Sequence, residues 1–169
     1  MKKNLVFIIL FSTAIITISG IWFTLQNQEH PGILAPAFSL VDLDGTDFKL
    51  VDFWGKIVVV DFVATWCGPC RQQIPHYEEI WEKYRDDIVL MSIDVDIRET
   101  EETIRAFAQD FPYSTWIWAR DTANIGRDYQ VTTIPKTVII DQEGYIRFEH
   151  VDVTNASTFT VEIEKLLSS

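Results

Sequence analysis

The sequence predicts an α/β domain with a central mixed β-sheet flanked by helices, and three segments carry this prediction. Residues 57–63 (IVVVDFV) are apolar apart from one aspartate, which is typical of a strand buried on both faces. Residues 100–111 place their apolar side chains at helical spacing, as in an amphipathic helix. Residues 137–140 and 145–149 alternate around a DQEG turn, which indicates a β-hairpin. Strands interleaved with helices favour an α/β fold.

The remaining elements follow from the same patterns. Residues 38–41 and 48–51 flank the turn DLDG and predict a small N-terminal β-hairpin. The other expected elements, in chain order, are a helix at 69–85 kinked by Pro75, a strand at 88–93, a short strand at 116–119, a short helix at 122–129 and a final helix at 157–167.

An apolar segment precedes this domain. Residues 5–25 carry no charge, and a run of about 20 such residues is long enough to cross a bilayer as one helix. Lys2 and Lys3 come before it, so the N-terminus is expected in the cytoplasm and the rest of the chain outside. A cleaved signal peptide is the competing interpretation, but its apolar core is usually shorter, about 7–15 residues, and Ser19-Gly20 is a poor cleavage site. We therefore predict a transmembrane anchor at residues 1–25.

The domain boundaries follow from composition. Residues 26–37 are polar and contain Pro31, Gly32 and Pro36, which predicts a tether. Residues 38–169 are long enough for one compact domain with its own core. The chain carries a net charge of −11, and this acidity argues against nucleic acid as a partner.

The only two cysteines, Cys67 and Cys70, lie in the motif WCGPC directly after the predicted strand at 57–63. Two thiols at this spacing on the first turn of a helix can close a disulfide with little rearrangement of the chain. The helix N-terminus favours a thiolate on Cys67, and the thiolate is the form that attacks a disulfide. This pattern predicts a redox-active dithiol.

Two other interpretations of the cysteine pair remain. A structural disulfide is typical of exported proteins, although so short a loop constrains the unfolded chain weakly. A zinc site needs about four ligands, but there is no second cysteine pair, and His30, His76 and His150 are scattered. We therefore predict no metal at this site.

Residues 60–70 (VDFVATWCGPC) resemble the active-site strand and turn of thioredoxin. The wider pattern resembles the membrane-tethered thioredoxin-like oxidoreductases of the TlpA/ResA type, on the segments APAFSL at 35–40, GKIVV at 55–59 and IPKTVIID at 134–141. The likeness runs from about Leu34 to the C-terminus. It implies a thioredoxin-like fold with an N-terminal hairpin, a central helical insertion at about 100–129 and the activity of a thiol–disulfide oxidoreductase.

Each residue of the motif has an expected role. Cys67 is the attacking nucleophile, and Cys70 resolves the mixed disulfide from one turn deeper in the helix. Gly68 and Pro69 shape the turn, because a proline fits a first helical turn that does not need its N–H. Trp66 is a flat apolar wall for the substrate, or a residue that only packs.

Asp61 is the third expected catalytic residue. A charge inside an apolar strand is costly unless it is functional or paired, and alternation places it on the same face as Val59 and Val63. The resemblance places it where thioredoxins keep a buried acid beneath the dithiol. Burial there raises the pKa and suits the group to exchange a proton with Cys70. The alternative is an aspartate that reaches the edge of the sheet.

The chain departs from the tethered oxidoreductases at two positions. Those proteins often carry asparagine where this chain has Asp61, and a glutamate where it has Gln73, three residues after Cys70. The proton-handling group is therefore expected on the strand, as in thioredoxin.

Ile134 and Pro135 are expected to bind substrate. The resemblance implies that Pro135 is cis and lies against the dithiol, and that the backbone of Ile134 pairs with an extended substrate segment. The alternative is an ordinary proline at the start of a strand. Lys136, which follows, is expected on the solvated surface.

The prediction is a single-pass membrane protein whose catalytic domain lies outside the cytoplasm. It exchanges the Cys67–Cys70 disulfide with protein thiols and disulfides, mainly as a reductant, in cytochrome c maturation or in disulfide reduction. The chemistry needs no cofactor, but it needs a membrane or thioredoxin-type electron donor. Two other functions remain as alternatives: a copper(I)-handling protein, for which only Met1 and Met91 could add thioether ligands, and a non-catalytic interaction domain.

Overall fold

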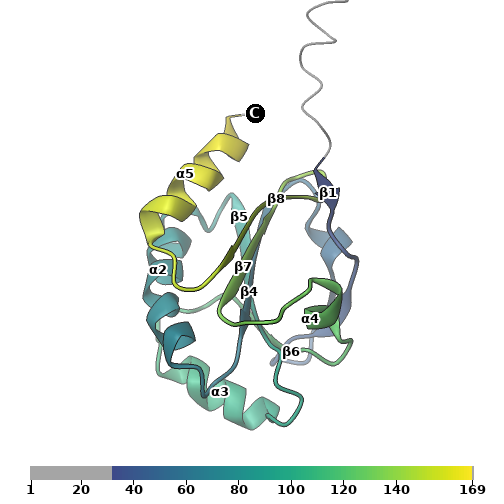
Figure 1. Cartoon of the computed structure of the whole chain (residues 1–169), viewed down its shortest axis with the longest axis vertical. Helices are drawn as coiled ribbons and strands as arrows, with labels where there is room; N and C mark the ends of the chain where they lie inside the picture. The colour runs from purple at the N-terminus through teal and green to yellow at the C-terminus, as the bar shows by residue number, and fades with distance from the viewer. Residues whose placement is uncertain (1–31, 169) are drawn as a thin grey trace, which may run out of the picture. The chain divides into compact units, whose positions relative to one another are not determined.

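A six-stranded mixed sheet runs through the middle of the domain (Figure 1). It is seen in a computed structural model that describes residues 32–168. In spatial order the strands are β1 (Ile33–Leu34), β8 (Tyr145–Val151), β7 (Lys136–Ile140), β4 (Ile57–Val63), β5 (Ile88–Asp94) and β6 (Ile117–Arg120). Strands β4, β5 and β6 are parallel to one another, whereas β1, β8, β7 and β4 pair antiparallel. The predicted mixed sheet is confirmed.

Different elements cover the two faces of this sheet. One face carries the helices α2 (Gly68–Tyr84), α3 (Glu101–Gln109) and α5 (Ala156–Leu167). The other carries the hairpin β2–β3 (Ser39–Val41 and Asp47–Lys49), the 3-10 turn η1 (Leu50–Phe53) and the short helix α4 (Ile125–Asp128). Figure 1 shows the sheet between these two layers.

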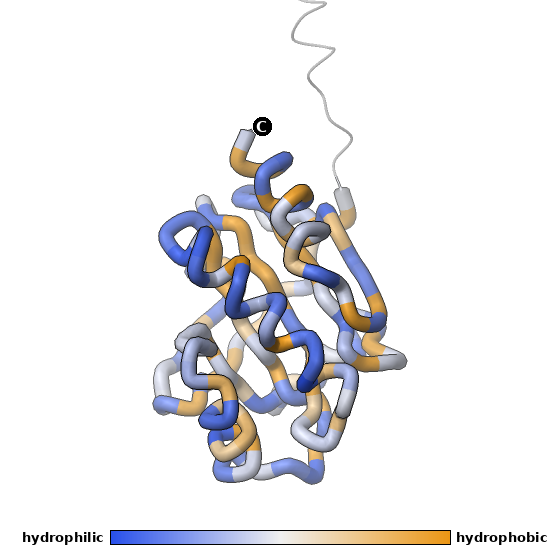
Figure 2. Tube along the Cα trace, turned by 90° about the vertical axis from the view of Figure 1, so that its left-hand side faces the viewer, coloured by the Kyte–Doolittle hydropathy of each residue, from blue (hydrophilic) through white to orange (hydrophobic). Residues whose placement is uncertain are grey.

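Strand β4 is the centre of the core, because all seven of its residues are buried. Val59 and Val63 face the side that α2 covers, whereas Val58, Val60 and Phe62 face the N-terminal hairpin and α4. Burying one such side chain contributes about 1.5–3 kcal/mol. Two covered faces explain why the strand is apolar at almost every position, and Figure 2 shows apolar segments through the interior with hydrophilic residues on the outer turns of the helices.

Helix ends are set by local side chains. Thr100 caps α3 by accepting a hydrogen bond from the Thr103 N–H, and Asn155 caps α5 by accepting one from the Thr158 N–H. Helix α2 continues through Pro75 as one helix, and the predicted kink there stays a prediction.

Several boundaries differ from the predicted ones. Ile33 and Leu34, inside the predicted tether, pair with β8, and a strand of two residues shows no alternation from which to predict it. The second hairpin strand ends early because the Asp52 carboxylate accepts a hydrogen bond from the Lys49 N–H at 2.8 Å and starts η1. The short strand predicted at 116–119 within the central insertion is present as the edge strand β6, shifted by one residue to Ile117–Arg120.

The predicted anchor at 1–25 and the first residues of the tether lie outside the described residues. Between residues 32 and 168, no helix combines the length and the apolar character that a membrane span requires.

Candidate redox site

The two cysteines form a disulfide at the N-terminus of α2. Cys67 is the N-cap residue, and its Sγ accepts a hydrogen bond from the Cys70 N–H at 3.1 Å. At this position the sulfur faces N–H groups that have no partner within the helix, at the positive end of the helix dipole. Both cysteines are buried, with exposed fractions of 4% for Cys67 and 1% for Cys70. When the disulfide opens, this setting favours the thiolate form of Cys67.

The turn between the cysteines is open to solvent. Gly68 and Pro69 are exposed, and Pro69 lies in the first turn of α2, where a missing N–H costs no intrahelical hydrogen bond. A side chain added at Gly68 would meet no atom within 4 Å. The turn at Gly68 therefore leaves space for an incoming group beside the disulfide.

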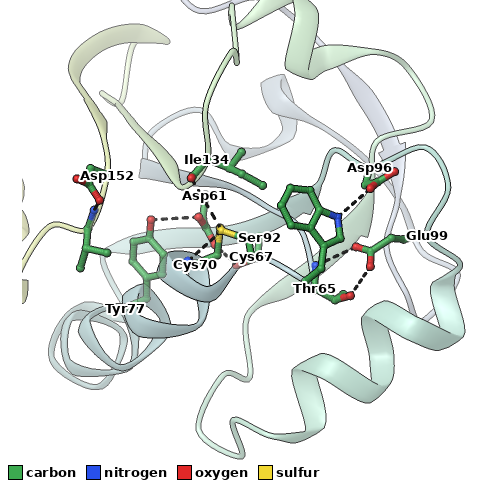
Figure 3. Close-up of a disulfide and its surroundings, with 12 residues drawn as sticks. Asp61, Thr65, Cys67, Cys70, Tyr77, Ser92, Asp96, Glu99, Ile134 and Asp152 are labelled. Atoms are coloured by element: carbon green, nitrogen blue, oxygen red, sulfur yellow. Dashed lines mark hydrogen bonds between the residues drawn. A yellow bond between two sulfur atoms is a disulfide. The ribbon is translucent and has the colours of Figure 1, made fainter.

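Ile134 and Pro135 lie beside the disulfide, on the loop before β7. The peptide bond between them is cis, as the resemblance implied. The carbonyl oxygen of Ile134 is 3.9 Å from Cys67 Sγ, and Figure 3 shows the two residues side by side. Pro135 is buried, and its carbonyl oxygen accepts a hydrogen bond from the Asp152 N–H at 2.9 Å.

Asp61 is buried on the α2 side of β4, with an exposed fraction of 1%. Its Oδ2 accepts a hydrogen bond from the Ser92 hydroxyl at 2.9 Å, and its Oδ1 accepts one from the Tyr77 hydroxyl at 3.2 Å (Figure 3). The expectation that Asp61 turns into the protein is confirmed, and the alternative that it reaches the edge of the sheet is excluded. Its expected proton exchange with Cys70 stays a prediction.

The carboxyl belongs to a row of polar residues that crosses three strands. In the sheet register, Asp61 pairs with Ser92 on β5 and with Thr137 on β7. The Tyr77 hydroxyl is 2.7 Å from Thr137 Oγ1, and the Trp116 indole N–H donates to Ser92 Oγ at 3.0 Å. The indole N–H leaves the Ser92 hydroxyl proton free to point at the carboxylate. The sequence analysis missed these four partners, although Ser92 and Thr137 are polar residues inside apolar strands, as Asp61 is.

Burial and hydrogen bonding shift the pKa of Asp61 in opposite directions. Burial raises the pKa of Asp61, the hydrogen bonds from Ser92 and Tyr77 lower it, and the result is about 7. Near neutral pH the carboxyl group is thus present in both protonation states. Burial and the adjacent Asp61 raise the pKa of Tyr77 well above its ordinary value, so this hydroxyl stays a donor.

The residues just before Cys67 are held by the loop that follows β5. The Trp66 indole N–H donates to Asp96 Oδ2 at 2.8 Å, while the ring keeps an exposed fraction of 65%. The Thr65 N–H donates to Glu99 Oε2 at 2.8 Å, and the Thr65 hydroxyl donates to the same carboxylate. Arg98 holds the pKa of Asp96 well below its usual range, so Asp96 accepts this bond as an anion. Trp66 is therefore a fixed, exposed aromatic surface next to the disulfide.

Two polar residues near the site are buried. Gln73 has an exposed fraction of 0%, and its side-chain amide donates to the Thr154 carbonyl and accepts from the Thr154 N–H. It ties α2 to the loop before α5 as a neutral group. Lys136 was expected on the solvated surface, and that expectation is wrong: its exposed fraction is 6%, and its ammonium group donates to the Tyr129 carbonyl. The loop before β7 supplies an acceptor that the sequence pattern does not reveal.

Comparison with known proteins identifies the family of this chain. The AhpC/TSA family model matches residues 31–149, and the chain belongs to the AhpC/TSA family. It is 35% identical over 155 residues to thioredoxin-like protein YneN of Bacillus subtilis, covering 89% of this chain and 91% of that protein. It is 29% identical to thiol-disulfide oxidoreductase ResA of Bacillus thuringiensis subsp. konkukian, covering 86% of this chain and 87% of that one.

A solved structure agrees with these relatives. A Chlorobium tepidum protein assigned as thiol:disulfide interchange protein DsbE superposes with a TM-score of 0.73 at 29% identity, covering 81% of this chain and 97% of that one. The predicted thioredoxin-like fold and the predicted enzyme class, a thiol–disulfide oxidoreductase, are confirmed.

The raised pKa of Asp61 predicts a pH-dependent gain in stability for Asp61→Asn. Between pH 4 and 7 the unfolded chain ionises this carboxyl while the folded protein keeps its proton, so stability falls as the pH rises. The loss amounts to on the order of 4 kcal/mol above pH 7. Urea unfolding of the oxidised protein should show Asp61→Asn more stable than the wild type at pH 8, with the difference vanishing towards pH 4.

The exposed Asp152→Asn variant is the matched control, because this carboxylate does not face the buried network. A difference between Asp61→Asn and the wild type that is the same at both pH values would contradict the assigned protonation behaviour.

Proposed function

We propose that the chain is a membrane-anchored, extracytoplasmic oxidoreductase that reduces disulfides in client proteins. The observation that carries the proposal is the Cys67–Cys70 disulfide at a helix N-terminus, with the Ile134 carbonyl 3.9 Å from Cys67 Sγ. This arrangement places a sulfur favoured as a thiolate beside a backbone segment with which a client can pair. Residues 5–25 supply the anchor in this proposal.

The first step starts from the reduced enzyme. The Cys67 thiolate attacks one sulfur of the client disulfide, which forms a mixed disulfide and releases the other client sulfur as a thiolate. The helix N-terminus stabilises the Cys67 thiolate before the attack and Cys67 as leaving group in the reverse reaction. Cys67 is the expected attacking residue because it is the N-cap of α2, where the helix N–H groups favour its thiolate, whereas Cys70 lies within the helix.

The second step releases the client. The Cys70 thiol loses its proton, and its sulfur attacks Cys67 Sγ, so that the second client sulfur leaves and the enzyme disulfide forms. Two electrons pass from the enzyme dithiol to the client disulfide, and the client takes up two protons. Asp61 is the expected acceptor of the Cys70 proton, because a carboxyl group with a pKa of about 7 can take up and return a proton near neutral pH.

The client is held by backbone pairing beside the disulfide. Among the described residues, no hydrogen-bond acceptor faces the backbone N–H of Ile134, and its carbonyl oxygen points towards Cys67. An extended client segment can therefore pair with Ile134 as an added strand. Gly68 leaves room for it, and the exposed ring of Trp66 offers an apolar contact on the other side of the dithiol.

The direction of electron flow follows from the residues between the cysteines. The Gly-Pro spacer is that of thioredoxin, whose potential is about −270 mV and which works as a reductant. A reductant outside the cytoplasm must receive electrons from a membrane or thioredoxin-type donor. General disulfide reduction fits this chain better than a role confined to cytochrome c maturation, because the acid is on β4 while the position three residues after Cys70 is the neutral Gln73.

A redox titration of the full-length chain in detergent tests this proposal. Equilibration with dithiothreitol buffers, followed by thiol alkylation and mass spectrometry, should give one two-electron transition near about −270 mV. A midpoint about 100 mV higher would make the protein an oxidant or an isomerase. The absence of any reversible transition would overturn the oxidoreductase function itself.

Trapping separates the roles of the two cysteines. Cys70→Ala should accumulate a long-lived mixed disulfide with a reducible protein such as insulin, because the resolving thiol is missing. Cys67→Ala should form no adduct, since it removes the sulfur at the N-cap of α2, where the helix favours a thiolate. Non-reducing electrophoresis measures both, and normal multiple turnover by Cys70→Ala would rule out the two-thiol mechanism.

A further inference from the structure

Lys136 is a buried cation directly after the cis-proline. Its ammonium group donates to the Tyr129 carbonyl oxygen at 2.6 Å and lies 3.4 Å from Glu149 Oε2. In the sheet register Lys136 pairs with Phe62, and the Tyr129 ring packs against the Phe62 ring with 5.3 Å between centroids. The lysine therefore lies on the face of the sheet opposite Asp61 and has no part in the buried carboxyl network.

The hydrogen bond of Lys136 closes the loop that carries Ile134 and Pro135. Tyr129 is the residue at which α4 ends, and the chain then runs through residues 130–135 into β7. The lysine side chain reaches back across this loop to Tyr129, the residue that precedes it. Because one end is in the sheet and the other is at the helix, the bond sets the distance between the two ends.

Few other bonds hold the middle of this loop. The Val131 N–H donates to the Gly126 carbonyl at 2.7 Å, and the Pro135 carbonyl accepts from Asp152. In the described structure, Thr132, Thr133 and the N–H of Ile134 have no backbone hydrogen bond to the rest of the domain. The position of Ile134 against Cys67 therefore depends on the packing of its side chain against the core, on the two ends of the loop and on the contact between those ends.

We propose that Lys136 is a positioning residue for client binding, which acts by holding the backbone edge of Ile134 beside the dithiol. This inference rests on the proposed function, in which a client segment pairs with Ile134. Lys136 touches neither the client nor the sulfurs in this role. It keeps the binding edge in place before the client arrives, so that the ordering cost is not incurred on binding.

The carbonyl bond, more than the ion pair, performs this role. The Glu149 side chain is 45% exposed and 3.4 Å away, so water can replace it, whereas the carbonyl bond is shorter and buried. Removing the lysine leaves the Tyr129 carbonyl without its donor, while removing the Glu149 charge leaves that bond intact.

The test compares two disulfide substrates of the full-length enzyme. Insulin presents its disulfides on a peptide backbone, whereas 5,5′-dithiobis(2-nitrobenzoate) has no backbone to pair with Ile134. For Lys136→Met, the KM for insulin should rise about tenfold with kcat nearly unchanged, because misplaced binding groups weaken productive association. The rate of reduction of the small disulfide should stay within about twofold of that of the wild type. The midpoint potential should not shift.

Three variants serve as controls. Lys136→Arg should restore the insulin KM, because a guanidinium can still donate to the Tyr129 carbonyl. Glu149→Gln should behave like wild type, and so should Lys165→Met, which removes an exposed lysine paired with Glu162 on α5. Amide hydrogen exchange should be faster at residues 130–134 in Lys136→Met and unchanged in β4.

Other results of these experiments would contradict the positioning role of Lys136 or the proposed function. An unchanged insulin KM with unchanged exchange in Lys136→Met would overturn the positioning role while leaving the oxidoreductase function intact. An equal loss with both substrates, or a loss of exchange protection throughout the domain, would assign Lys136 to general stability. A wild-type enzyme inactive towards both substrates would overturn the proposed function and this inference with it.

Discussion

The carboxyl group of Asp61 lies in the middle of a strand that is buried on both faces, so its hydrogen-bond partners must come from the protein. Those partners are Ser92 on the neighbouring strand and Tyr77 on α2, and Tyr77 is in turn bonded to Thr137. An unpaired carboxyl at this depth would cost several kcal/mol, on the order of the whole stability of a domain. The strand order and the seating of α2, whose N-terminus carries the disulfide, are linked through this one group.

Strand β7 connects the Asp61 network with the loop that carries Ile134. Thr137 turns to the α2 face and joins the Asp61 network, whereas Lys136 turns to the other face and bonds to Tyr129. Pro135 comes immediately before both residues and places Ile134 beside Cys67. The alternation of side chains along one strand thus supports the buried Asp61 network on one face of the sheet and the proposed binding edge from the other.

The residues beneath the disulfide are held by hydrogen bonds, whereas the surface above it is open. Below the sulfurs every polar group of the Asp61 network is bonded, whereas above them Gly68 is uncovered and Trp66 is 65% exposed. The loop at 95–99 holds Trp66 and Thr65 from outside the sheet by two carboxylates. A rigid base under an open surface suits the proposed binding of extended client segments, because it keeps one sulfur in the same place.

Local periodicity and short motifs in the sequence were enough to predict the α/β class, the strand at 57–63, the main helices and the dithiol. The sequence also indicated that Asp61 turns inward, since alternation along one strand is a local property. The other members of the Asp61 network depend on tertiary structure, because Ser92, Tyr77 and Thr137 come from three elements that strand order and register bring together. The same reason explains the error at Lys136, because a lysine is buried only where a distant segment supplies an acceptor, here the carbonyl of Tyr129.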